Sequence, residues 1–134
     1  MPYITLYIST LFSFLFIDIL MIKNIILPIF ERNLGNIMLE SPRLLIALLF
    51  YLFYVAGILY LSAAPYLKGN TTLNEAVISA FIIGLLAYGT YGITNYATLR
   101  GWTLQMLAVD TLWGGVLTAT SLFIGLKITK LISG

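Results

Sequence analysis

The sequence predicts an all-α integral membrane protein, a four-helix bundle, and three observations support that prediction. Of the 134 residues, 60% are hydrophobic and 9% are charged, whereas a soluble domain carries about 25% charged residues. The mean hydropathy is +1.01. The apolar residues fall into four runs long enough to cross a bilayer. Because no repeat or linker divides the chain, we expect residues 1–134 to form a single transmembrane helical domain.

The first predicted span covers residues 3–22. A helix of about 20 residues rises roughly 30 Å, which is the thickness of the hydrocarbon core. Asp18 is its one charged residue, and Lys23 with Asn24 marks its exit. The apolar run is longer than a signal peptide's core of about 7–15 residues and lacks a basic start, so we expect a retained helix.

Residues 28–40 are too polar to span the membrane. Their apolar side chains recur at helical spacing (Phe30, Leu34, Ile37 and Met38), which predicts a short amphipathic segment at the membrane interface. Ser41 followed by Pro42 is typical of a helix N-terminus. We therefore expect a second span over residues 42–64, ended by the turn residues that begin at Pro65.

The third predicted span, residues 72–100, begins with a capping box formed by Thr72 and Glu75. At about 43 Å it is too long for an upright crossing. We therefore expect it to tilt or to bend near Gly89 and Gly92. Trp102 is expected at the membrane interface, and the fourth span follows over residues 103–126.

Two acidic residues are predicted to lie at one membrane depth. Four spans place the 23–43 and 98–103 connections on one side of the membrane. Asp18 lies about five residues from the middle of its span towards that side, and Asp110 about five residues from the middle of the fourth span in the same direction. A charge at the bilayer centre costs about 2.5–3.5 kcal/mol. Both side chains are therefore expected to face inward.

The polar end of the third span reaches the same leaflet. Its sequence, Y-G-T-Y-G-I-T-N-Y-A-T-L-R-G-W, gathers most of the chain's intramembrane polar side chains: Tyr88, Tyr91, Thr94, Asn95, Thr98 and Arg100. Gly84, Tyr88, Tyr91 and Asn95 share one helix face, and small or polar residues form a similar stripe from Asp110 to Gly125.

We expect the two stripes to pack together, with Arg100 as the nearest cation for one of the acids. The side chains would then form a ligand, proton or substrate site. The alternative is purely structural, because stripes of small residues are common helix-packing surfaces and buried polar groups can form a network without a ligand.

The motif also carries a family resemblance. Together with Asp110 and the Trp113-Gly114 pair, it resembles the Y-G-T-Y-D-x-T-N-x-A-T-L-x-x-W and D-x-x-W-G signature of an uncharacterised family of bacterial inner-membrane proteins. The resemblance extends over nearly the whole chain. It implies a four-helix bundle of unknown function and adds Trp113 to the candidate site. Gly92 stands where the signature has an aspartate, and Thr103 where relatives have a proline.

Composition removes several functional classes. The chain has no cysteine and no histidine, so thiolate chemistry, a typical zinc site and a Ser-His arrangement are not expected. We expect no metal and no cofactor. The net charge of +2 comes from scattered lysines and arginines, so no nucleic-acid partner is expected.

Three functions remain open. The favoured one is a binding or transport module with a polar pocket in one leaflet for a lipid headgroup, a small solute or a proton. The second is a structural or accessory subunit. The third is an intramembrane lipid-modifying enzyme, with an aspartate as general base and Asn95 or Tyr91 stabilising charge. The expected partners are membrane lipid and either a second copy or a larger membrane protein. We expect a bacterial inner membrane with both termini cytoplasmic, although basic residues are nearly balanced between the two sides.

Overall fold

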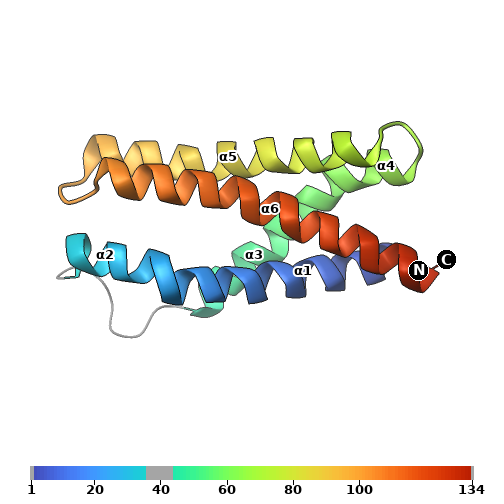
Figure 1. Ribbon diagram of the computed structural model, residues 1–134, viewed down its shortest axis with the longest axis horizontal. Coiled ribbons are helices and arrows are strands. Elements are labelled where there is room, and N and C mark those ends of the chain that lie inside the picture. Colours follow the sequence, from blue (N-terminus) through green and yellow to red (C-terminus); the bar gives the residue numbers. More distant parts are fainter. Residues whose placement is uncertain (1, 36–43, 134) are drawn as a thin grey trace.

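The computed structural model describes residues 2–35 and 44–133, and the regular elements in these ranges are helices (Figure 1). In chain order they are α1 (Pro2–Met21), the π-helical turn η1 (Ile22–Ile26), α2 (Leu27–Leu34), α3 (Leu44–Ile58), the π-helical turn η2 (Leu59–Ala63), α4 (Ala64–Leu67), α5 (Leu73–Thr98) and α6 (Leu104–Ser133).

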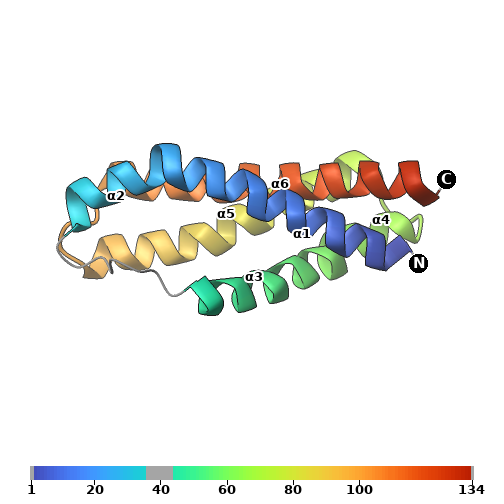
Figure 2. The ribbon, with the colours of Figure 1, turned by 90° about the horizontal axis from the view of Figure 1, so that it is seen from below.

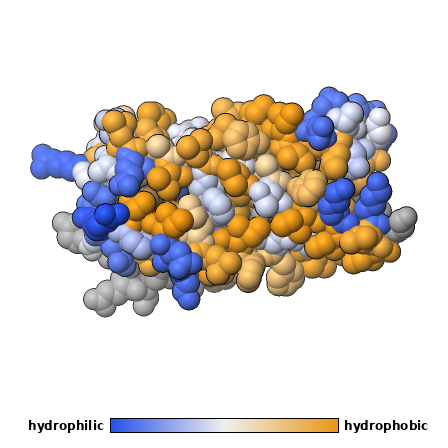
Figure 3. Space-filling view, in the orientation of Figure 1, coloured by the Kyte–Doolittle hydropathy of each residue, from blue (hydrophilic) through white to orange (hydrophobic). Residues whose placement is uncertain are grey.

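The described residues contain four helices long and apolar enough to cross a membrane: Tyr3–Leu34, Leu45–Leu67, Leu73–Thr98 and Leu104–Ile132. This confirms the predicted four-helix membrane fold. The start of α1 and the end of α6 lie at the same end of the bundle (Figures 1 and 2). On the face shown in Figure 3, hydrophilic residues gather at the two ends of the long axis and hydrophobic residues dominate between them.

The first helix continues past its predicted end at residue 22. The nitrogen of Pro28 cannot donate to the carbonyl of Asn24, and its ring would crowd that turn of an α-helix. The wider turn η1 ends two residues before Pro28, so the helix continues through the proline without a break. The predicted interfacial segment is therefore continuous with α1 as far as Leu34, with Ile29 and Leu34 buried. Its remaining residues, 36–40, lie outside the described residues.

The second helix passes a proline in the same way. The turn η2 ends two residues before Pro65, and α4 carries the helix on to Leu67, beyond the predicted end at residue 64. The predicted N-cap at Ser41 and Pro42 lies outside the described residues. In two of the four spans, a π-helical turn before a proline therefore allows the helix to continue past that proline.

The third helix starts as predicted. The Thr72 hydroxyl accepts a hydrogen bond from the Glu75 backbone N–H (3.1 Å), and the Glu75 carboxylate accepts one from the Thr72 N–H (3.2 Å). The helix then runs without interruption through Gly89 and Gly92 to Thr98, a length of about 39 Å. It ends two residues before the predicted end at Arg100.

Alanine at Thr72 is expected to lower the free energy of unfolding by about 0.5–2 kcal/mol, because the helix loses its N-cap. Unfolding in mixed micelles measures this difference. Thr98→Ala is the control, since the exposed Thr98 hydroxyl only donates to the Thr94 carbonyl of its own helix and should change stability by less than about 0.5 kcal/mol. Equal losses in the two variants would contradict the capping role.

The turn before α6 contains another hydroxyl group that caps a helix. It belongs to Thr103, which stands where relatives have a proline. Thr103 accepts a hydrogen bond from the Met106 backbone N–H at 3.1 Å. Gly101, in the turn before it, has φ +86°, a conformation that side chains with a Cβ rarely adopt. The helix α6 then continues to Ser133, beyond the predicted end at residue 126.

The helices α5 and α6 approach each other at their backbones. A Cβ added to Gly84 would lie 2.2 Å from the Gly114 carbonyl oxygen and 2.7 Å from the Gly115 Cα. Further along α6, a Cβ on Gly125 would collide with the Thr10 side chain of α1. The small-residue stripe of α6 is therefore divided: its first part packs on α5, as predicted, and its second part packs on α1.

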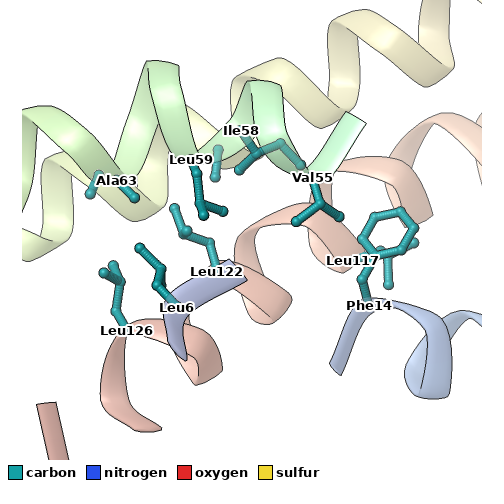
Figure 4. Packing of buried hydrophobic residues seen from close by; sticks show 11 residues of the cluster. Leu6, Phe14, Val55, Ile58, Leu59, Ala63, Leu117, Leu122 and Leu126 are labelled. Atoms are coloured by element: carbon teal, nitrogen blue, oxygen red, sulfur yellow. The ribbon is translucent and has the colours of Figure 1, made fainter. Parts of the chain in front are cut away.

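Two hydrophobic clusters fill the bundle. The larger, called the main cluster here, joins all four spans (Figure 4). Its buried members are Leu6, Phe14, Val55, Ile58, Leu59, Ala63, Ala76, Ala80, Leu117, Leu122 and Leu126. The smaller one, called the end cluster, consists of Ile29, Leu34, Trp102 and Met106. The polar residues considered next come from the part of the chain between these clusters.

Candidate functional site

The two intramembrane acids are buried in the protein. Asp18 on α1 is 4% exposed and Asp110 on α6 is 8% exposed. Their carboxyl groups are close enough to interact electrostatically. The structure thus brings together the two acids that depth counting placed at one level, and neither faces lipid.

Asp18 has hydrogen-bond donors from two other helices. The indole Nε1 of Trp113 on α6 donates to Asp18 Oδ1 at 3.0 Å. The hydroxyl of Tyr51 on α3 also interacts with the carboxyl group. These donors are neutral, so Asp18 is tied to α3 and α6 by hydrogen bonds and not by the predicted ion pair.

Asp110 differs, because no protein hydrogen bond to its carboxyl group is found among the described residues. Its side chain lines a pocket of about 430 Å³, called the tyrosine pocket here. The lining residues come from α3, α5 and α6: Phe50, Tyr51, Tyr54, Ala87, Tyr88, Tyr91 and Asp110. The carboxyl group of a largely buried residue therefore faces an open space without a protein hydrogen bond.

Neighbouring helices hold the tyrosine rings. The Tyr54 hydroxyl and Thr118 Oγ1 are hydrogen-bonded at 2.9 Å. The Tyr54 and Tyr88 rings meet edge to face, with centroids 6.3 Å apart. Tyr88 also fills the space above Gly114, where a Cβ would lie 2.2 Å from Tyr88 Cγ. A glycine on α6 therefore sets the position of one pocket wall.

The polar motif of α5 is divided between two environments. Tyr88 and Tyr91 line the pocket, and Asn95, one turn further along, is half-buried. Thr94 and Thr98 are exposed, and the Thr98 hydroxyl donates to the Thr94 carbonyl at 2.7 Å. The motif therefore supplies two tyrosines to the pocket and places its threonines on the outer surface.

Arg100 does not join the acids. It is exposed in the turn after α5, and the groups that act on Asp18 are Trp113 and Tyr51. Because α5 ends at Thr98, Arg100 lies beyond the helix face that carries Tyr88 and Tyr91. The expectation that it would pair with a buried acid is corrected.

Trp102 is buried in the protein, at 6% exposure, and its predicted position at the membrane interface stays a prediction. Its ring meets Phe30 of α2 and Tyr91 of α5 edge to face, at 5.1 and 5.6 Å. The close approach of Gly101 to the Asn33 carbonyl oxygen brings the turn against α2. Trp102 thus links the tyrosine pocket to the end cluster.

Sequence reasoning missed the α3 wall of the pocket. The residues proposed from the sequence do not include Tyr51 and Tyr54, but both line the pocket beside Asp110. Residues three apart lie on one helix face, but depth counting along the predicted span 42–64 places Tyr51 and Tyr54 near its middle, whereas both acids lie about five residues from the middle of their spans.

Four long apolar helices around a buried pair of acids define the protein as an integral membrane helical bundle. The chain belongs to the family described as "Predicted membrane protein (DUF2177)", whose model matches residues 3–127. The family resemblance inferred from the sequence is thereby confirmed. No curated protein matches the chain. No solved structure matches it either.

Proposed function

We propose that the protein is a membrane binding or transport module whose tyrosine pocket holds the polar group of a ligand at the level of one leaflet. The observation that carries the proposal is the Asp110 carboxyl group, which is 8% exposed and lines a 430 Å³ pocket. A buried acidic group without a partner is costly. A ligand that supplies hydrogen-bond donors or a compensating charge would remove that cost.

The size and walls of the pocket support the proposal. Pockets for small molecules commonly have volumes of about 300–1,000 Å³, with apolar or aromatic walls and few polar groups. In the tyrosine pocket Asp110 is the single carboxylate among aromatic side chains and one alanine. This arrangement gives a ligand apolar contact and one orienting group.

The path of α3 supports access from the lipid. The start of α3 lies away from α5, and the two chain segments converge towards α4 (Figures 1 and 2), where Ser62 and Ser79 are hydrogen-bonded at 2.8 Å. Large apolar side chains are exposed along the first turns of α3: Leu45, Ile46, Leu48, Leu49, Phe50 and Phe53. A ligand would thus enter beside Phe50, from the bilayer.

The main cluster closes the other half of the bundle. Leu6, Val55 and Leu122 of this cluster are fully buried, and Figure 4 shows side chains from three spans meeting there. Binding from one leaflet needs no change in this cluster. Transport would require these side chains to separate.

Substituting Asp110 by asparagine is expected to weaken ligand binding by about tenfold or more, since a hydrogen bond to a charged group contributes about 1.5–3 kcal/mol. Short-chain phosphatidylethanolamine, short-chain phosphatidylglycerol and choline serve as probes, with tyrosine and tryptophan fluorescence of the solubilised protein as readout. At least one probe should bind the wild type.

Glu31→Gln is the matched control, because it also neutralises a carboxylate but at an exposed position on α2. Its affinity for each probe should equal that of the wild type. Failure of the wild type to bind any of the three probes, or equal binding by the Asp110→Asn variant, would contradict the proposal.

A further inference from the structure

We infer that the group bound in the tyrosine pocket is an organic ammonium ion. The inference rests on the proposed function and specifies the chemistry of the ligand. Two features carry it: the charge around the pocket and the aromatic composition of its walls.

Two acidic side chains lie at the pocket, and among the described residues no basic side chain lines it. Asp110 lines the pocket, and Asp18 interacts with it electrostatically. In the described part of the chain every lysine and arginine is exposed: Lys23, Arg32, Lys68, Arg100, Lys127 and Lys130. None of them lines the pocket. An ionised carboxylate at this position repels an anionic ligand, whereas a cation neutralises it inside a medium of low dielectric constant.

The aromatic walls of the tyrosine pocket favour an organic cation. Five of the seven lining residues are aromatic, and the face of an aromatic ring is negative. Phe50 and Tyr54 of α3 are stacked with centroids 6.3 Å apart, while Tyr88 and Tyr91 come from α5. Aromatic rings from two sides together with a carboxylate form the surroundings that recognise alkylated ammonium groups.

The same features disfavour a bare metal ion as the occupant. The described residues contain no group of three or more His, Cys, Asp or Glu side chains that could hold one. A volume of about 430 Å³ is also much larger than a coordinated ion requires, and aromatic walls offer it few oxygen ligands. An ammonium group with carbon substituents would fill more of the pocket and would contact its aromatic walls.

Such a group can come from a lipid headgroup or from a free amine, and the chemistry at Asp110 would be the same. The first experiment compares choline with 3,3-dimethylbutan-1-ol, which has the same shape without the charge, on protein in phosphatidylglycerol nanodiscs. Choline should bind at least about tenfold more tightly, since a desolvated cation–π contact contributes about 2 kcal/mol. Equal affinities would overturn the ammonium inference and leave the pocket as a binding site.

The second experiment tests the aromatic wall at Tyr91, which is 57% exposed, so that its substitution should spare the fold. Tyr91→Leu should weaken choline binding severalfold without changing the affinity for the neutral analogue, and Tyr91→Phe should restore it. Loss of affinity for both compounds in Tyr91→Leu, or no recovery in Tyr91→Phe, would contradict recognition of the cation by the ring.

A competition experiment tests whether the ammonium group belongs to a lipid headgroup or to a free amine. Short-chain phosphatidylethanolamine and ethanolamine each compete with choline for the pocket. Displacement by the lipid at a concentration at least tenfold lower identifies a headgroup, and equal displacement identifies a free amine. If neither compound displaces choline, the ammonium inference is overturned.

Discussion

Alanine at Gly84 is expected to lower the free energy of unfolding by about 1–3 kcal/mol, a typical cost of overpacking. The new Cβ would lie 2.2 Å from the Gly114 carbonyl oxygen and 2.7 Å from the Gly115 Cα. Both are backbone atoms that cannot rotate away, so α5 and α6 must move apart. The measurement is equilibrium unfolding of the purified protein in mixed micelles.

Gly57→Ala is the matched control, because it makes the same chemical change in α3 where no atom lies within 4 Å of the new Cβ. Removing a glycine from a helix interior should there stabilise the protein by about 0.5–1 kcal/mol. The two substitutions should therefore have opposite signs. A stabilising effect at Gly84 would mean that α5 and α6 do not touch through their backbones.

Replacing Trp113 by phenylalanine is expected to destabilise the protein by about 1.5–3 kcal/mol beyond the loss of ring area, because the Asp18 carboxylate loses a hydrogen-bond donor. Asp18 is 4% exposed, so water cannot readily replace the indole N–H. In an Asp18→Leu background the same substitution should cost much less, and a double-mutant cycle measures the difference.

Trp102→Phe makes the same chemical change without that hydrogen bond. The Trp102 Nε1 is buried and has no hydrogen-bond partner among the described residues, so losing it removes an unsatisfied donor. Trp102→Phe should therefore cost less than Trp113→Phe. Equal costs, or a cycle with no coupling to Asp18, would show that the Trp113–Asp18 bond does not stabilise the bundle.

Composition and periodicity predicted the fold because a bilayer leaves few alternatives. A run of about twenty mostly apolar residues with few charges is long enough to form a spanning helix, and four such runs gave the bundle. The start of α5 was also predicted correctly, because the side chains of Thr72 and Glu75 each accept a hydrogen bond from the other residue's backbone N–H. The ends of the first two spans were predicted too early: the first because Lys23 and Asn24 indicate an exit from the membrane, and the second because Pro65 stops an α-helix but not one that widens before it.

The site was predicted only in part. Depth counting brought Asp18 and Asp110 together, since it needs only the rise per residue. The prediction for Arg100 failed because α5 ends at Thr98, two residues earlier than predicted, which leaves Arg100 exposed in the following turn. The α3 wall, Tyr51 and Tyr54, depends on the angle at which α3 crosses the bundle, which no local pattern encodes. Whether the predicted residues bind a ligand stays a prediction.

The turn η1 corrects the helical phase of the first span. At about 100° per residue, Leu34 would lie about 160° around an unbroken α-helix from Asp18, on the opposite side. One inserted residue reduces the angle to about 60°, and both side chains are buried. A helical wheel drawn through Pro28 without this offset would turn Leu34 towards lipid. The inserted residue lets a single long helix keep its acid and its far apolar end directed at the same neighbours.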